Sequence, residues 1–336
     1  MLNTLEKIGL RAEAAAQELK GATKAAKDKA LLLAASEVRS NSKAIIKANV
    51  SDLNFAHDKK LTAALLDRLM LDEARLESIA SGLEMIAQLP DPVGTVLSTW
   101  DRPNGLNISR VSVPLGVIGI IYESRPNVTA DAGGLCLKSG NAVILRGGSE
   151  SFHTSGELVR CLKRGLRSAN LPEDSVQLVP TRDREAVGHL LRMTKYVDII
   201  VPRGGKSLVD KVQKESKIPT IAHLEGLCHV YLDAAADLEM AKNVTLNAKM
   251  RRTGVCGAAE TLLVDTQVAN MLLPPVARTL LDHGCILRGD TGACDLVPEM
   301  ERASEADWST EYPVSYTHLR AHETDSYLVC RLLLEK

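Results

Sequence analysis

The spacing of hydrophobic residues changes along the chain and predicts two kinds of region. Up to about residue 90 the apolar positions follow a helical period. The clearest case is 72–89, where apolar residues three or four positions apart share one face. Asp72 can cap the start of that helix and Pro90 stops it. The first part of the chain is therefore predicted to be helical.

Two extended segments follow this helical region. Val93–Trp100 and Leu106–Val113 are separated by a short segment that contains Pro103 and the pair Asn104-Gly105. Proline and Asn-Gly are turn formers between strands. The pattern predicts a β-hairpin arm.

From Gly116 onward, short apolar runs rich in β-branched residues alternate with helical stretches. The runs are Val117–Tyr122, Ala142–Leu145, Val176–Pro180, Val197–Val201, Val230–Leu232 and Glu260–Val264. The helical stretches are Ser151–Arg167, Arg184–Met193, Lys206–Lys214, Leu238–Lys249 and Gln267–His283. Such alternation is typical of βαβ units, so we expect an α/β fold with a mainly parallel sheet covered by helices on both faces.

Composition narrows the class of protein. The 336 residues are 45% hydrophobic and 25% charged, which fits a two-domain enzyme. The net charge of −1 is spread without charged blocks and aromatic residues make up 3%, which argues against a nucleic-acid partner. No stretch approaches the roughly 20 apolar residues that span a bilayer, and residues 1–20 lack a signal peptide, so no membrane partner is expected. Seven scattered cysteines without metal-type spacing favour free thiols, a reducing cytoplasm and no metal site.

Cys256 is the first candidate for chemistry. It lies between a predicted helix and the strand Glu260–Val264, with glycine on either side and two arginines, Arg251 and Arg252, upstream. Small neighbours let a substrate carbonyl approach, and nearby cations favour the nucleophilic thiolate. A buried structural cysteine is the alternative, and the local sequence leaves both open.

His223 is a second candidate, at the end of a predicted strand. Histidine can transfer protons near neutral pH, although a lone histidine is more often structural. Glu225 is an alternative acid or base with equally thin local support.

Two glycine-containing turns connect predicted strands to helices. They are Leu145–Glu150, with the sequence LRGGSE, and Pro202–Ser207, with the sequence PRGGKS. Glycines let a backbone close on an anion, and a helix N-terminus favours negative charge. Neither turn is a GxGxxG fingerprint or a Walker loop, and such turns also occur for packing. Two of them, each with a basic residue, favour a phosphate-bearing nucleotide.

Several longer motifs resemble, in the right order, those of the γ-glutamyl phosphate reductase family. They are Ser112–Thr129 (SVPLGVIGIIYESRPNVT), Thr181–Gly188, Val201–Gly205, Cys228–Tyr231, and Asn247–Lys249 followed by the Cys256 loop. The resemblance runs from near the N-terminus to about Tyr312 and places the chain in the aldehyde dehydrogenase superfamily.

The resemblance implies an aldehyde-dehydrogenase-like architecture. A Rossmann-like cofactor domain is expected at 1–226, with a β-hairpin oligomerisation arm at about 93–113, and a partial α/β catalytic domain at 227–312. The intact family is expected to form homo-oligomers. The segment 313–336 shows no convincing period, caps or family counterpart and is predicted to be a non-family, artefactual tail. We then expect severed strand neighbours with open sheet edges.

The resemblance also implies catalytic roles for individual residues. Cys256 stands at the nucleophile position, and Asn127 is a candidate oxyanion-hole or substrate residue. His223 stands where many aldehyde dehydrogenases keep a glutamate base. That replacement suits a reductase that must keep water away from a thioester.

Further residues are expected to bind the cofactor. Arg146 stands at the position of a lysine that contacts the adenosine ribose, and Ser149 stands where NAD-preferring relatives carry a glutamate. Loss of that carboxylate at Ser149, together with the guanidinium gained at Arg146, suits the 2′-phosphate of NADPH. Glu311 aligns with a glutamate that binds the nicotinamide ribose. The rest of the expected set is Gly147, Gly148, Arg203, Gly204 and Gly205.

The reaction implied is the NADPH-dependent reduction of L-glutamyl 5-phosphate to L-glutamate 5-semialdehyde. It releases phosphate and proceeds through a thioester on Cys256, in proline biosynthesis. Glutamate 5-kinase is a candidate partner. The alternatives are an aldehyde dehydrogenase that runs in the oxidative direction, an inactive truncated fragment that retains only nucleotide binding, and a globular fragment that binds nothing.

Overall fold

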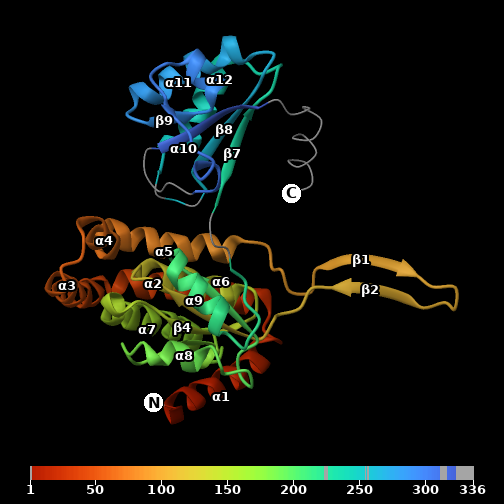
Figure 1. Cartoon of the computed structure of the whole chain (residues 1–336). Coiled ribbons are helices and arrows are strands. Elements are labelled where there is room, and N and C mark those ends of the chain that lie inside the picture. The colour runs from red at the N-terminus through yellow and green to blue at the C-terminus, as the bar shows by residue number, and fades with distance from the viewer. Residues whose placement is uncertain (1, 223–225, 254, 256, 311–315, 323–336) are drawn as a thin grey trace. The chain divides into compact units, whose positions relative to one another are not determined.

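The computed structural model describes residues 2–222, 226–253, 255, 257–310 and 316–322. It divides into two compact units, Met1–Ala222 and His223–Lys336, and each is described by itself (Figure 1). Among the described residues, no helix is long and apolar enough to cross a membrane.

The first unit begins with the predicted helical region. Its helices are α1 (Leu2–Leu19), α2 (Lys24–Ser40), α3 (Ser42–Asp58), α4 (Ala63–Leu69) and α5 (Glu73–Gln88). The prediction for α5 is confirmed, and the Asp72 side chain caps the helix by accepting a hydrogen bond from Arg75 N at 2.7 Å. The helix ends two residues before Pro90, which has no N–H to continue it.

The predicted hairpin is also confirmed. Strands β1 (Val96–Asp101) and β2 (Asn107–Val111) pair antiparallel and extend from the unit as an arm (Figure 1). Every residue of both strands is exposed. An isolated two-stranded ribbon is marginally stable at best in water, so this arm depends for its stability on contacts outside the ribbon.

A parallel sheet forms the centre of the first unit, with the strand order β5-β4-β3-β6 among the described residues. Its strands are β3 (Val117–Tyr122), β4 (Ala142–Arg146), β5 (Val176–Leu178) and β6 (Ile199–Arg203). The helices and 3₁₀ helices between and after them are α6 (Pro126–Lys138), η1 (Ser149–Ser151), α7 (Phe152–Ser168), η2 (Glu173–Ser175), α8 (Glu185–Leu190) and α9 (Lys206–Glu215). The α/β prediction is confirmed.

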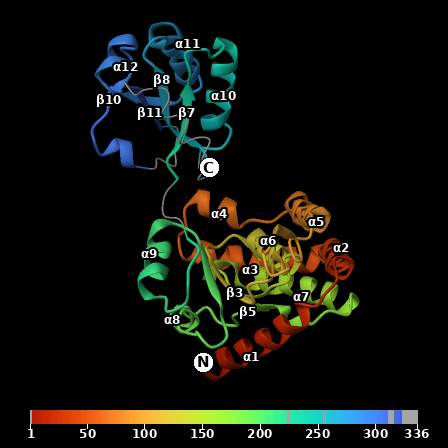
Figure 2. The ribbon, with the colours of Figure 1, turned by 90° about the vertical axis from the view of Figure 1, so that its right-hand side faces the viewer.

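Both faces of this sheet are covered by helices, as predicted (Figure 2). Alternate residues of β3 point to opposite sides: Ile118, Ile120 and Tyr122 join a core with α2, α5, α6 and α7, whereas Val117 and Ile121 join a core with α1, α8 and α9. All six residues of β3 are buried. The strand is therefore central, and both sides of the unit pack on it.

One strand boundary differs from the prediction for a clear reason. The apolar run predicted a strand at Val197–Val201, but β6 begins at Ile199. Val197 is buried, yet its N–H bonds Met193 O at 3.0 Å and so completes the turn that precedes the strand. Burial of a turn residue makes the hydrophobic run longer than the strand.

The second unit contains a second sheet, in which every described strand pair is parallel. Its elements are β7 (Cys228–Leu232), α10 (Leu238–Met250), β8 (Ala259–Asp265), α11 (Ala269–Asp282), β9 (Ile286–Gly289), α12 (Thr291–Leu296), β10 (Glu301–Arg302), η3 (Asp307–Ser309) and β11 (Tyr316–His322). The described sheet has the order β10-β9-β11-β8-β7. Leu262, Leu273 and Val276 lie in its hydrophobic core.

The segment after residue 312 requires a correction. The sequence showed no period there and indicated open sheet edges, but Tyr316–His322 forms β11. This strand pairs in parallel with β8 on one side and β9 on the other. Its backbone therefore supplies the hydrogen-bond partners that β8 and β9 would otherwise lack. The origin of residues 313–336 stays a prediction.

Candidate functional site

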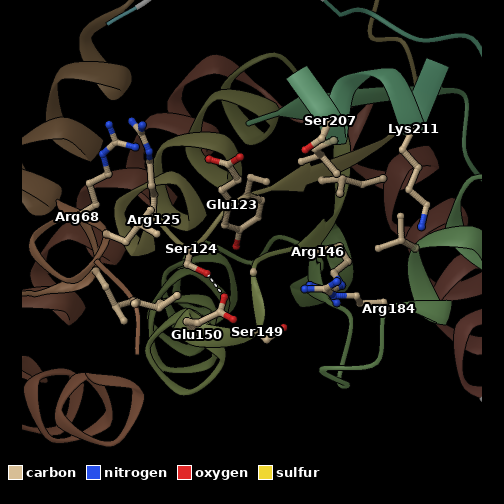
Figure 3. A pocket seen from close by; sticks show the side chains of 18 residues that line it. Arg68, Glu123, Ser124, Arg125, Arg146, Ser149, Glu150, Arg184, Ser207 and Lys211 are labelled. Carbon is tan, nitrogen blue, oxygen red and sulfur yellow. Dashed lines mark hydrogen bonds between the residues drawn. The ribbon is translucent and has the colours of Figure 1, made fainter. Parts of the chain in front are cut away.

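A cavity of about 570 Å³ opens in the first unit where β3 and β4 end and α9 begins (Figure 3). The carboxyl ends of parallel strands are where α/β proteins bind ligands. The charged side chains that line it are Arg68, Arg125, Arg146, Arg184 and Lys211 on the positive side, and Glu123 and Glu150 on the negative side. Five cations against two carboxylates make the cavity suited to an anionic ligand.

The first glycine-containing turn contributes Arg146, whose side chain is buried and turned toward the backbone. Its guanidinium donates to the carbonyl oxygen of Gly147 and, at 3.2 Å each, to those of Arg182 and Asp183. Its Nε is buried without a hydrogen-bond partner among the described residues. Burial lowers the pKa of Arg146. Arg146 thus holds the segment 182–183 against the end of β4.

The two glycines of this turn let β3 and β4 end close together. A Cβ on Gly147 would lie 3.0 Å from the ring of Tyr122, and one on Gly148 would lie 2.7 Å from Ser124 N. Ser124 in turn donates from its hydroxyl to Glu150 Oε2 at 2.5 Å. Packing against β3 is therefore a sufficient reason for both glycines.

The second turn packs on the same strand end through Glu123. Its Oε1 accepts a hydrogen bond from Gly205 N at 2.6 Å, and a Cβ on Gly204 would lie 2.7 Å from its Cγ. Gly205 is the N-cap of α9, so the carboxylate of Glu123, the residue just after β3, supplies the negative charge that a helix N-terminus favours. Arg203 is exposed at the end of β6.

The helix after the first turn is capped in the same manner by a residue far away in sequence. Asp52, on α3, is fully buried and accepts hydrogen bonds from His153 N at 3.1 Å and from Thr154 N at 2.8 Å. It also accepts from the Thr154 hydroxyl at 2.7 Å. Arg182 pairs with the same carboxylate at 3.5 Å and stacks on the ring of Phe55, 4.3 Å from its centroid. Nothing in the local pattern around 145–150 predicts this contact.

Two further cations, Arg184 and Lys211, also line the cavity. Arg184, at the N-cap of α8, and Lys211, on α9, also line an adjoining hollow of about 420 Å³. Both residues are exposed, and in the part of the chain that the structure describes neither side chain has a hydrogen-bond or ion-pair partner. Neither residue was among the predicted site residues, although a basic residue at the first position of the predicted helix Arg184–Met193 was a usable signal for Arg184.

The predicted catalytic residues are only partly described. Cys256 and His223, together with Glu311 of the cofactor set, lie outside the described residues. Asn127 is exposed on α6 and donates to Asp131 Oδ2 at 3.1 Å. It does not line the 570 Å³ cavity. Burial raises the pKa of Asp131, which Asn127 and the charge of Arg203 partly offset.

Two of the described cysteines are poor candidates for a nucleophile. Burial raises the pKa of the Cys136 thiol to about 12 and that of the Cys161 thiol to about 11, so both stay protonated at neutral pH. No group of three or more His, Cys, Asp or Glu side chains gathers in a metal-binding arrangement among the described residues.

Comparisons with known proteins decide the family. The model of the aldehyde dehydrogenase family matches residues 4–282. The γ-glutamyl phosphate reductase of Paramagnetospirillum magneticum is 59% identical over 305 residues, which cover 91% of this chain and 72% of that protein. The chain is a member of the aldehyde dehydrogenase family and, within it, of the γ-glutamyl phosphate reductases. The protein of the same name from Rhodospirillum rubrum is 55% identical over 331 residues, covering 95% of this chain and 78% of the relative.

Solved structures agree with this assignment. The crystal structure of γ-glutamyl phosphate reductase from Thermotoga maritima matches with a TM-score of 0.90 and 35% identity, covering 98% of this chain and 80% of that one. An acetylating aldehyde dehydrogenase from Geobacillus thermoglucosidasius matches with a TM-score of 0.62 at 14% identity and shows the shared fold alone. The predicted family and fold class are therefore confirmed.

Proposed function

We propose that this chain catalyses the NADPH-dependent reduction of L-glutamyl 5-phosphate to L-glutamate 5-semialdehyde, with release of phosphate, in proline biosynthesis. The observation that carries the proposal is 54–59% identity to four proteins named γ-glutamyl phosphate reductase. The excess of cations in the cavity of the first unit supports a phosphate-bearing cofactor.

The residues present fit a nicotinamide nucleotide. A cavity of about 570 Å³ lies in the range of ligand sites, and it sits at the carboxyl edge of the sheet with cations at both ends. Arg146, Ser149 and the turn at Arg203 are the groups expected to hold the cofactor, with Glu311 near the nicotinamide ribose. When bound, NADPH supplies a hydride to the acyl carbon.

Cys256 is the proposed nucleophile. Its thiolate attacks the acyl carbon of the substrate, the bond from carbon to the phosphate oxygen breaks, and a thioester and inorganic phosphate result. Arg251 and Arg252 stand five and four positions before it and favour the thiolate. After reduction, the hemithioacetal collapses, which returns the thiolate and releases the semialdehyde. Asn127 is the proposed stabiliser of the oxyanion.

His223 is proposed to help exclude water and not to activate it. A carboxylate base at this position would promote hydrolysis of the thioester, which a reductase must avoid. The chain is further proposed to act in the cytoplasm and to form homo-oligomers through the exposed hairpin, with glutamate 5-kinase as a candidate partner. The apolar side chains exposed on that hairpin, including Val96, Trp100 and Ile108, support an oligomerisation arm.

The test runs the reaction in reverse. The purified chain receives glutamate 5-semialdehyde, NADP and phosphate, and NADPH absorbance is followed for the wild type, Cys256→Ala and the control Cys294→Ala. We expect phosphate-dependent NADPH formation that is lost only in Cys256→Ala. Equal rates in wild type and Cys256→Ala would overturn the nucleophile. Turnover of simple aldehydes with NAD and without phosphate would favour an oxidative dehydrogenase, and NADPH binding without turnover would favour a nucleotide-binding fragment.

A further inference from the structure

We infer that Arg184, together with Lys211, makes the contact that selects a 2′-phosphorylated nucleotide, and that Arg146 acts as a positioning residue for Arg184. This inference rests on the proposed function, because it names the residues that would distinguish NADPH from NADH. It departs from the expectation that Arg146 itself reads the phosphate.

The two helix N-termini beside the cavity already have carboxylate side chains bound to their N–H groups. Asp52 accepts from two N–H groups at the start of α7, and Glu123 accepts from Gly205 N at the start of α9. A helix N-terminus attracts an anion mainly through such free N–H groups. Side-chain cations therefore have to provide the attraction for a further phosphate.

The Arg146 side chain is engaged by backbone carbonyl groups. Its guanidinium donates to three backbone carbonyl oxygens, those of Gly147, Arg182 and Asp183, and it is 7% exposed. Turning it toward a ligand would break those three hydrogen bonds, which hold the segment 182–183 at the end of β4. The remaining Nε–H is buried and cannot grip a phosphate bidentately on its own.

The segment 181–184 is fixed from both sides. Arg146 holds its carbonyl oxygens, while Arg182 pairs with the buried Asp52 and stacks between Phe55 and Phe152. Asp183 N bonds the Thr181 hydroxyl at 3.1 Å, and Asp183 Oδ1 accepts from Glu185 N at 2.9 Å. The Arg184 side chain therefore extends from a rigid turn. A side chain on a preorganised backbone loses less entropy when it binds a ligand.

Arg184 and Lys211 line both the 570 Å³ cavity and the 420 Å³ hollow next to it. In Figure 3 they lie at the same end of the cavity as Arg146, whereas Arg68 and Arg125 lie at the opposite end and Glu123 lies between. Glu185 and Glu215 also line the hollow, but Arg192 offsets one of these charges. A doubly charged phosphate would find an unpaired guanidinium and an ammonium there.

The experiment compares binding of 2′,5′-ADP with binding of 5′-AMP by isothermal titration calorimetry, in one buffer of fixed ionic strength. These probes differ only in the 2′-phosphate and need no catalytic turnover. For Arg184→Gln we expect at least a tenfold loss of affinity for 2′,5′-ADP and less than a twofold change for 5′-AMP. Lys211→Gln should give a smaller loss of the same kind, and Arg184→Lys should retain part of the preference. The control Arg192→Gln removes a charge that lines only the adjoining hollow and should change neither affinity more than twofold.

Arg146→Lys separates positioning from direct contact. Because lysine cannot reach several carbonyls at once, we expect faster hydrogen exchange at the amides of 181–184 together with a weaker preference for 2′,5′-ADP. Arg184→Gln should leave that exchange unchanged. A wild-type preference that survives Arg184→Gln, or that falls in Arg146→Lys without faster exchange, would overturn the inference. A wild type that binds neither probe would overturn the proposed cofactor, and this inference with it.

Discussion

The two glycine-containing turns of the first unit look alike in sequence, but the carboxylates that cap the helices after them differ in burial. Each joins a strand to a helix, each has an arginine followed by two glycines, and β4 and β6 place them on either side of β3. The helix after the first turn is capped by Asp52, which is fully buried and paired with Arg182. The helix after the second is capped by the exposed Glu123.

The difference shows which properties of a turn its local sequence motif predicts and which it does not. The glycines make room for the last residues of β3, which is a property of the backbone that the motif encodes. The negative charge at each helix start comes from Asp52 on α3 or from Glu123 just after β3, at a distance of 101 or 82 residues along the chain. The motif therefore predicts a close turn, whereas its electrostatic character depends on tertiary contacts.

The largest expected effect separates the two caps. Asp52→Ala should destabilise the protein by about 3 kcal/mol, because buried N–H groups at the start of α7 lose their acceptor and Arg182 loses its carboxylate. The matched change Glu123→Ala should cost less than about 1 kcal/mol, since water can replace an exposed cap. Urea unfolding followed by circular dichroism measures both. Equal losses would mean that burial does not distinguish the caps.

A smaller effect is expected from the glycines themselves. Gly148→Ala should cost about 1–3 kcal/mol, because the added Cβ would meet the backbone of Ser124. Gly205→Ala should change stability by less than about 0.5 kcal/mol, because only the movable Glu123 Oε1 lies near, at 3.3 Å. Both glycines have ordinary negative φ values of −59° and −67°, so backbone strain does not confuse the comparison. Thermal unfolding of the two variants side by side would contradict the prediction if their order were reversed.

The smallest effect concerns Asp131, which lies near Arg203 of the second turn. Burial raises its pKa, so the folded state holds the proton more tightly than the unfolded state, where the pKa is about 3.9. The favourable contribution of Asp131 to the free energy of unfolding is complete below the pKa of the unfolded state. It is lost as the pH rises through the pKa of the folded state. Asp131→Asn should therefore gain stability relative to wild type between pH 4 and pH 7. Denaturant titration measures this difference. If the stability of Asp131→Asn relative to wild type were flat or fell over that range, burial would not be raising the pKa of Asp131.

Much of the fold could be predicted from the sequence because it follows local rules. The cap at Asp72, the hairpin around Asn104-Gly105 and the β-branched run at Val117 each act over a few residues. The family could be predicted because long motifs such as Ser112–Thr129 carry information that a single pattern does not.

The support of the 570 Å³ cavity could not be predicted in the same way. Asp52 shows no sign in the sequence of its role, because the residues that it caps lie on α7. Arg146 was expected to face a ligand, but the carbonyl groups that it binds come from a turn more than thirty residues away. The strand β11 was missed because a central strand can form from an irregular run when both neighbours offer unpaired backbone.

The crowded end of β3 has a consequence for how cofactor preference can change. Tyr122, Glu123 and Ser124 each contact one of the two glycine-containing turns, so a side chain added at Gly147, Gly148 or Gly204 requires one of them to move or change. Arg184 and Lys211 are exposed and bear no such dependence. The proposed nucleotide preference would therefore change through single substitutions at the two cations, whereas Gly147, Gly148 and Gly204 accept a side chain only together with a coordinated change. In an engineering library, diversity placed at the two cations should give folded variants far more often than diversity placed at those three glycines.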